Sequence, residues 1–282
     1  MAFTTLVDTA TLAAHLGDPQ WVVVDCRFVL RDPEAGRRAY AAAHIPGARY
    51  AHLNDDLSAP VTAQTGRHPL PDTARLARRL GEWGIDHNKQ IVAYDDSSGA
   101  IAARLWWLLR WLGHDAVAVL NGDWRVWLRE RRPQTADASA VTATTFNPRP
   151  GSLPQVKADA VLQTVGTGRA LLLDARSEER FRGEVEPFDK VAGHIPGAVN
   201  LPFEDNLQPN GCFLPAAALR EQYRALLGDR ASATVTHMCG SGVTACHNLL
   251  AMEHAGLAGS RLYVGSWSEW ITDPNRPIAT GA

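Results

Sequence analysis

The hydrophobic positions of the chain form short continuous runs that alternate with longer stretches of helical spacing. The apolar runs cover residues 21–25, 91–95, 117–120, 170–174, 234–238 and 261–263. The stretches with helical spacing cover residues 73–83, 100–112, 216–227 and 244–255. Short apolar runs that end at polar residues are typical of buried parallel strands. Because strands and helices alternate, we predict an α/β protein whose mainly parallel sheets are flanked by helices.

Three motifs occur twice in the chain, in the same order. They are Asp-x-Arg at 25–27 and 174–176, His-Ile-Pro-Gly-Ala at 44–48 and 194–198, and Gly-x-Trp at 122–124 and 265–267. The repeat is far too long for a solenoid and predicts two copies of one domain. We place the domains at 1–132 and 155–282. Residues 133–154, rich in Pro, Thr, Ala and Ser, are the predicted linker. The Asp and Arg of each Asp-x-Arg motif are expected to form an ion pair.

Composition narrows the class of protein further. The 282 residues are 45% hydrophobic and 21% charged, and 28 Lys and Arg against 30 Asp and Glu give a net charge of -2. This balance is ordinary for a globular protein and offers no basic surface for nucleic acid. The apolar stretch 101–112 contains Arg104 and Arg110 and is too short to cross a bilayer. The N-terminus has neither a basic start nor an apolar core, so we expect a cytoplasmic protein without membrane or nucleic-acid partners.

The sharpest chemical signal is the loop that begins at Cys239. An apolar run ends there, Gly240 and Gly242 free the backbone, and a helix is predicted to follow. Such a loop directs several backbone N–H groups to one point and can hold an anion at the sulfur. In the first half, Asp95 occupies the equivalent place. A carboxylate cannot carry a transferred sulfur, so we expect one reactive domain and one silent copy. None of the four cysteines forms a Cys-x-x-Cys pair, and we expect neither a metal nor a cofactor.

Together these motifs resemble those of the tandem-domain rhodanese family, the thiosulfate/3-mercaptopyruvate sulfurtransferases. The likeness covers nearly the whole chain, from the repeated motifs to the closing Gly-Ser-Trp-Ser-Glu-Trp at 265–270. It implies two rhodanese-like domains, the first inactive and the second catalytic. It also implies a sulfurtransferase in which Cys239 takes a sulfane sulfur, becomes a persulfide, and passes that sulfur to a thiophilic acceptor. Cyanide, small thiols and thioredoxin are the candidate acceptors.

The resemblance also suggests individual site residues. The Gly-Ser-Gly loop is similar to that of the mercaptopyruvate group, whereas basic residues after the Cys would indicate the thiosulfate group. Ser241 matches the serine of that group's Ser-His-Asp arrangement, His68 its histidine, and Asp56 its aspartate, with Asp55 as the neighbouring alternative. The predicted substrate-binding residues are Arg180, Glu186, Gly240, Gly242, Val243 and Thr244. The resemblance implies that arginines bind the donor carboxylate, and Arg180 matches the first of them.

One position departs from the family pattern. The mercaptopyruvate group has a second arginine after a Glu-Pro step, but the segment here is Glu-Pro-Phe-Asp-Lys at 186–190. Phe188 stands near the position expected for this arginine. Lys190 is the cation that would have to replace the missing arginine. A flexible ammonium is not equivalent to a planar guanidinium. The preferred donor, 3-mercaptopyruvate or thiosulfate, therefore stays open.

Two other functions compete with this interpretation. A cysteine phosphatase would need an arginine to close the loop around phosphate. Here Ala245 stands six residues after Cys239, and none of the loop residues is basic. A non-catalytic binding or regulatory module would leave Cys239 unused, and would form no persulfide in the presence of a sulfur donor.

Overall fold

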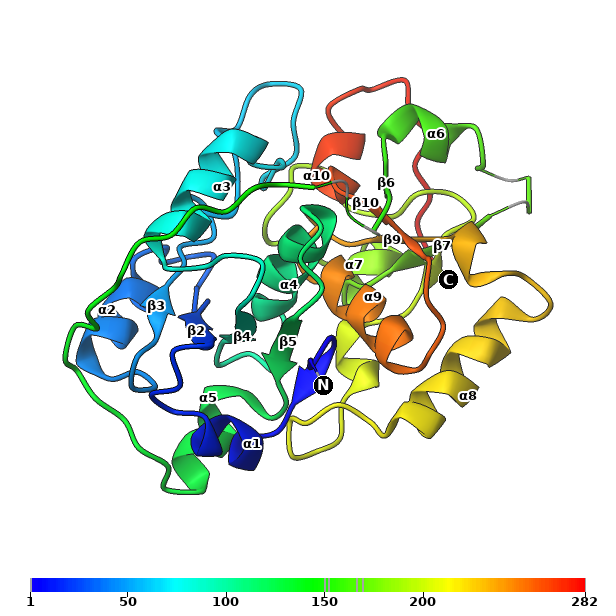
Figure 1. The fold of residues 1–282 in the computed structure, drawn as a ribbon. Coiled ribbons are helices and arrows are strands. Elements are labelled where there is room, and N and C mark those ends of the chain that lie inside the picture. Colours follow the sequence, from blue (N-terminus) through cyan, green and yellow to red (C-terminus); the bar gives the residue numbers. More distant parts are fainter. Residues whose placement is uncertain (1, 150, 152, 166, 169, 282) are drawn as a thin grey trace. The chain divides into compact units, whose positions relative to one another are not determined.

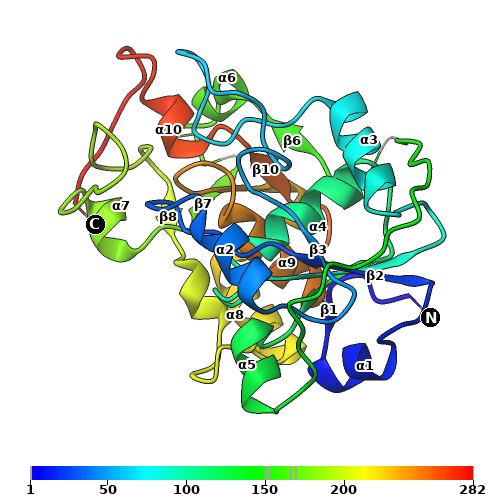
Figure 2. The same ribbon diagram turned by 90° about the vertical axis from the view of Figure 1, so that its left-hand side faces the viewer.

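The chain folds into two compact units, each built around its own sheet. The computed structural model describes residues 2–149, 151, 153–165, 167–168 and 170–281. The first unit comprises residues 1–59, 70–152 and 208–213, and the second comprises 60–69, 153–207 and 214–282. Each unit holds a five-stranded sheet in which every pair of neighbouring strands is parallel. Figures 1 and 2 show the elements from two directions.

The sheet of the first unit has the strand order β1-β5-β4-β2-β3. Its strands are β1 (Leu6–Val7), β2 (Trp21–Asp25), β3 (Arg49–Tyr50), β4 (Gln90–Tyr94) and β5 (Val117–Leu120). Its helices are α1 (Thr9–Ala14), α2 (Ala35–Ala42), α3 (Thr73–Glu82), α4 (Ala102–Trp111) and α5 (Asp123–Arg129). The three central strands are almost wholly buried, which explains why they read as continuous apolar runs.

The second unit repeats this order as β6-β10-β9-β7-β8. Its strands are β6 (Gln155–Val156), β7 (Leu171–Asp174), β8 (Val199–Asn200), β9 (Val235–Met238) and β10 (Arg261–Tyr263). Its helices are α6 (Ala158–Leu162), α7 (Glu178–Arg182), α8 (Ala216–Leu227), α9 (Ala245–His254) and α10 (Ser266–Trp270), with short 3₁₀ helices at Phe203–Asn206 and Ser232–Thr234. The predicted α/β class with two similar domains is thus confirmed.

The Asp-x-Arg motifs form the same buried ion pair in both units. Arg27 Nη2 lies 2.6 Å from Asp25 Oδ2, and Arg176 Nη2 lies 2.6 Å from Asp174 Oδ2. Each guanidinium also lies 4.8 Å from the ring centroid of the tryptophan of its own unit's Gly-x-Trp motif. In each unit, the Asp-x-Arg and Gly-x-Trp motifs therefore form one local structure. The ion pair expected within each Asp-x-Arg motif is confirmed.

The structure contains elements that the sequence did not predict, among them the short helices α1, α2, α5, α6, α7 and α10. The edge strands β1, β3, β6 and β8 were not predicted, because two residues are too few to show a hydrophobic period. Helix α4 begins at Ala102 instead of residue 100. At this end of the helix the Asp95 carboxylate accepts hydrogen bonds from the N–H groups of Ile101 and Ala102.

The two units are not continuous in sequence, because each includes a short segment from the other half of the chain. Residues 60–69 belong to the second unit, where the Arg67 N–H donates to Ser268 Oγ at 3.0 Å. Residues 208–213 belong to the first unit, where the Phe213 N–H donates to Asn121 Oδ1 at 2.9 Å. The first of these segments carries His68, so this histidine lies in the same unit as Cys239 although the repeat places it in the first copy.

Candidate active site

The loop between β9 and α9 holds Cys239 at its start. Cys239 is 2% exposed, and its Sγ accepts a hydrogen bond from the Gly242 N–H at 3.1 Å. Gly242 has a φ of +73°, and a Cβ at this position would lie 2.2 Å from the Val264 carbonyl oxygen. Only glycine fits such a conformation and such a close approach. The glycine thus lets the loop turn back and direct its amide to the sulfur.

The loop is fixed from the opposite side by the turn that enters α10. The Cys239 N–H donates to Ser266 Oγ at 3.1 Å, and the N–H of Trp267 donates to the Cys239 carbonyl at 3.0 Å. The Ser268 N–H donates to the Gly240 carbonyl at 2.9 Å. These bonds explain why the Gly-Ser-Trp motif accompanies the cysteine loop: its backbone holds the loop in place.

Ser241 and His68 are brought together, as the resemblance implied. Ser241 Oγ lies 2.7 Å from His68 Nδ1, and both residues are buried. Asp56 lies in the first unit, where its carboxylate accepts from the His52 N–H and from Arg79 Nε, both at 2.8 Å. Its participation with the serine and histidine stays a prediction. The neighbouring Asp55 is an exposed carboxylate whose Oδ2 lies 3.4 Å from Arg37 Nη2.

The remaining predicted residues line the same part of the second unit. Arg180 Nη2 lies 2.9 Å from Glu186 Oε1, and the Glu186 side chain is only 3% exposed. Val243 is buried, and Thr244 is half-buried directly before α9. The Arg180 guanidinium lies above Gly240: a Cβ on that glycine would be 3.3 Å from Arg180 Nη2.

Arg67 and Asp189 are two charged residues of this region that sequence reasoning missed. Arg67 Nη2 lies 2.7 Å from the position of a Cβ on Gly240, and Arg67 Nη1 pairs with Asp189 Oδ1. Burial raises the pKa of Asp189, while the Arg67 guanidinium partly opposes that rise. A signal was present, since Arg67 directly precedes His68. Arg67 and Gly240 are far apart in the chain, so the sequence did not indicate that they lie close together.

The first unit shows what stands in place of the cysteine in the copy that we predict to be silent. The Asp95 side chain is fully buried and accepts four backbone hydrogen bonds, each between 2.8 and 2.9 Å, from Ser97, Gly99, Ile101 and Ala102. Burial raises the pKa of Asp95 and the four amides oppose that rise. The loop that could hold an external anion is thus filled by a carboxylate of the chain itself.

His237 lies in β9, two residues before Cys239, and is expected to make stability depend on pH. Burial lowers its pKa from 6.5 to about 3, and within the described structure its Nδ1 has no hydrogen-bond partner. Between these two values the unfolded chain binds a proton that the folded chain does not. The free energy of unfolding should therefore fall as the pH drops from about 6.5 towards 3, by up to about 1.4 kcal/mol per pH unit from this group.

Urea unfolding measured at several pH values in that range tests this expectation. The variant His237→Leu removes the titrating group and should show a shallower loss of stability on acidification than the wild type. Equal slopes for the two proteins would contradict the assignment of this pH dependence to His237.

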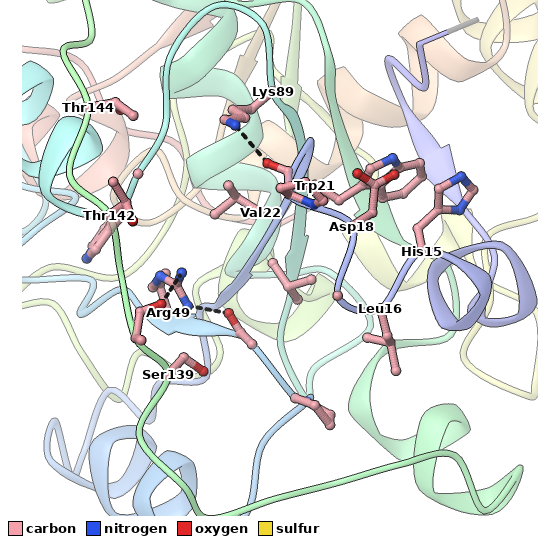
Figure 3. Close-up of a pocket in the computed structure, with 18 residues that line it drawn as sticks. His15, Leu16, Asp18, Trp21, Val22, Arg49, Lys89, Ser139, Thr142 and Thr144 are labelled. Carbon is pink, nitrogen blue, oxygen red and sulfur yellow. Dashed lines mark hydrogen bonds between the residues drawn. The ribbon is translucent and has the colours of Figure 1, made fainter.

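Figure 3 shows a cavity of about 400 Å³ that belongs to the first unit. Its lining includes Lys89 and Arg49, which donate to the carbonyl oxygens of Pro19 at 2.7 Å and Ala140 at 3.3 Å, respectively. It contains none of the residues that the cysteine loop brings together. Its cations bind the chain's own backbone, so we do not assign it to the chemistry of Cys239.

The described residues contain no group of three or more His, Cys, Asp or Glu side chains suited to a metal ion. Among the same residues, no helix is long and apolar enough to cross a membrane. All four cysteines are free.

Comparison with known proteins identifies the class. The rhodanese-like domain model matches residues 8–130 and 157–273, so the chain belongs to the rhodanese-like domain family and, within it, to the thiosulfate/3-mercaptopyruvate sulfurtransferase group. The chain is similar to a probable 3-mercaptopyruvate sulfurtransferase of Pseudomonas aeruginosa, with 50% identity over 100% of both chains. It is 39% identical to a putative thiosulfate sulfurtransferase of Mycobacterium tuberculosis, over 98% of this chain and 97% of the relative.

A solved structure supports the same assignment. SseA from Escherichia coli, described as a 3-mercaptopyruvate sulfotransferase with the rhodanese fold, matches 95% of this chain and 100% of its own, with a TM-score of 0.79 and 31% identity. The resemblance inferred from the motifs is therefore confirmed.

Proposed function

We propose that this chain moves a sulfane sulfur from 3-mercaptopyruvate to a thiophilic acceptor through a persulfide on Cys239. The observation that carries the proposal is the pairing of Ser241 with His68 beside the cysteine loop, in a chain whose relatives are sulfurtransferases. The loop residues supply an anion site, and the two side chains supply a route for a proton.

The chemistry balances without an added oxidant. The Cys239 thiolate attacks the donor sulfur, a sulfur–sulfur bond forms, and the donor's carbon–sulfur bond breaks. The electron pair of that bond stays on the carbon, which takes up the proton of the donor thiol and leaves as pyruvate. The persulfide anion then gives its outer sulfur to an acceptor such as cyanide, releasing thiocyanate and restoring the thiolate. Small thiols and thioredoxin are the other acceptors we propose.

The silent copy supports the role of the backbone amides. In the first unit, an equivalent loop gives four N–H groups to the two oxygens of Asp95. In the second unit, the residue at that place is a cysteine whose sulfur already accepts one such bond from Gly242. We propose that the outer sulfur of the persulfide takes the place that the carboxylate fills in the first unit. Preorganised donors of this kind stabilise a charge without reorganisation.

The Ser241–His68 pair favours a donor that carries a thiol proton. The imidazole and hydroxyl can move that proton within one hydrogen-bonded pair. Thiosulfate has no such proton, and the loop has no basic side chain for a second negative charge. We therefore place 3-mercaptopyruvate before thiosulfate. We assign Asp56 as a further member acting through His68, and we propose a reducing, cytoplasmic setting because the thiols are free.

The direct test compares the two donors. The protein is incubated with 3-mercaptopyruvate or thiosulfate, weighed by intact-protein mass spectrometry, and assayed for kcat/KM with cyanide as the acceptor. We expect the gain of one sulfur atom and the higher kcat/KM with 3-mercaptopyruvate. A higher kcat/KM with thiosulfate would overturn the donor assignment. No added sulfur with either donor would favour the non-catalytic binding module.

Replacing Ser241 with alanine should separate the donors further. Loss of one positioned proton-transfer group costs about 100-fold or more in kcat, and only 3-mercaptopyruvate requires the transfer. We expect a drop of that order with 3-mercaptopyruvate and a much smaller change with thiosulfate. His68→Gln should give the same pattern, because it removes the other half of the pair. An equal loss with both donors would show that these residues support the loop without moving a proton.

A further inference from the structure

We infer that Arg67 is the second cation that binds the carboxylate of the sulfur donor, beside Arg180, whose role the family resemblance already implied. This inference rests on the proposed function, because it concerns the donor of the same reaction. It adds a specificity-determining residue from the segment 60–69, which the sequence motifs of the cysteine loop do not include.

Both guanidinium groups lie above the residue that follows the reactive cysteine. A Cβ on Gly240 would lie 2.7 Å from Arg67 Nη2, 3.3 Å from Arg180 Nη2 and 3.6 Å from Arg180 Nη1. Any larger residue at this position would push against Arg67. The two cations therefore lie beside Gly240, the residue that follows Cys239 in the loop.

An internal carboxylate shows that the two guanidiniums can share one anion. Asp189 Oδ1 pairs with Arg67 Nη1, while Asp189 Oδ2 lies 3.5 Å from Arg180 Nη2. The ring of Phe188 lies near both cations, with its centroid 6.0 Å from Arg67 Cζ and 5.1 Å from Arg180 Cζ. These contacts hold the two planar groups near each other before a donor arrives. Two guanidiniums on one carboxylate is the arrangement that we propose for the donor as well.

The guanidiniums keep hydrogen-bond donors for a ligand after these contacts are made. Arg67 Nε is buried and has no hydrogen-bond partner in the described part of the chain. Arg180 bonds Glu186 through Nε and Nη2, which leaves its Nη1 on the side of Gly240. The side chains of Arg67 and Arg180 retain 24% and 17% of their exposure. Asp189 and Glu186 thus act as positioning residues, while Arg67 Nη2 and Arg180 Nη1 lie beside Gly240.

The donor's own geometry suits this placement. In 3-mercaptopyruvate the carboxylate and the sulfur stand at opposite ends of a short chain, so the sulfur can meet Cys239 while the carboxylate lies above Gly240. A planar fork binds both carboxylate oxygens, which an ammonium cannot do. Lys190 is exposed and forms none of the ion pairs found among the described residues of this cluster. The structure therefore favours Arg67 over Lys190 as the second cation.

The experiment compares two donors that differ only in the carboxylate. Mercaptoacetone keeps the thiol and ketone of 3-mercaptopyruvate but has a methyl group in place of the carboxylate. Turnover of both donors is measured for the wild type, Arg67→Gln, Arg180→Gln and Lys190→Gln. The matched control is Arg182→Gln, because Arg182 lies on the same helix as Arg180 and pairs with the exposed Glu178 and Glu184.

We expect Arg67→Gln and Arg180→Gln each to lower the preference for 3-mercaptopyruvate over mercaptoacetone, in kcat/KM, about tenfold or more, since a hydrogen bond to a charged group is lost. The main change should be a higher KM for 3-mercaptopyruvate. Arg182→Gln and Lys190→Gln should retain the wild-type preference.

Other results would overturn the inference. An unchanged preference in Arg67→Gln, or a loss in Lys190→Gln instead, would remove Arg67 from donor recognition. Arg67→Gln leaves Asp189 without its main cation, so the double variant Arg67→Gln/Asp189→Asn checks folding: it should regain stability but not donor preference. A regained preference would also count against the inference. Failure of the proposed function is distinct, because the wild type would then form no persulfide with any donor.

Discussion

The variant Cys239→Ser is expected to form no sulfur adduct with any donor and to lose at least about a thousandfold in turnover. A serine hydroxyl would keep the size of the side chain and could still accept the Gly242 hydrogen bond that Sγ accepts at 3.1 Å. Oxygen cannot form the persulfide, however, so the loop would persist without its chemistry. Intact-protein mass spectrometry after incubation with 3-mercaptopyruvate measures the adduct, and a cyanide-coupled assay measures turnover.

The matched control for this variant is Cys212→Ser. Cys212 is a free, half-buried cysteine of the first unit, and burial raises the pKa of its thiol. The control should gain one sulfur and turn over like the wild type. If the sulfur adduct still forms in Cys239→Ser but not in Cys212→Ser, the reactive thiol lies in the first unit, and the assignment of Cys239 is overturned.

The variant Asp95→Ala should destabilise the first unit by at least about 3 kcal/mol, because each buried donor left unpaired costs about 1–3 kcal/mol. Four backbone N–H groups lose their acceptor in this substitution. Asp95→Asn should also destabilise, since an amide offers one oxygen where the carboxylate offers two. Hydrogen exchange measured by mass spectrometry should show faster exchange in peptides that cover residues 95–102.

The neighbouring carboxylate provides the control. Asp96 accepts from Ser97 Oγ at 3.4 Å and is partly exposed, so Asp96→Ala should change stability by less than about 1 kcal/mol. If Asp95→Ala and Asp96→Ala lower the free energy of unfolding equally, the four backbone hydrogen bonds to Asp95 do not contribute the stability expected of them. If neither changes exchange at residues 95–102, the proposed reason for the silent copy is wrong.

Much of the fold followed from local pattern. The central strands of both sheets are buried on both faces, so they read as short apolar runs, and the duplicated motifs predicted two equivalent domains. The two-residue edge strands were missed because they carry no period. The start of α4 was placed two residues too early, and the contact of Asp95 with the N–H groups at 101 and 102 was not predicted.

Some residues of the site were likewise recognisable from the sequence, whereas others were found only in the folded structure. Cys239 and its glycines are neighbours in the chain, so their loop was recognisable from spacing. The contact between Ser241 and His68 was expected only through resemblance to a family, because 173 positions separate the two residues. Arg67 was not found, since the sequence directed attention to residues 186–190 for a second cation. Its nearness to Gly240 is a property of the folded chain.

By itself, the sequence determined the α/β class and the duplication, and it predicted the reactive cysteine and the silent aspartate. Each of these depends on residues that act through their immediate neighbours or through a repeated local pattern. Only the tertiary structure decided that residues 60–69 pack with the second unit and bring His68 and Arg67 to the cysteine loop. The reason is physical: the hydrogen bond from Arg67 to Ser268 and the ion pair with Asp189 join residues distant in the chain, and no local periodicity records such contacts.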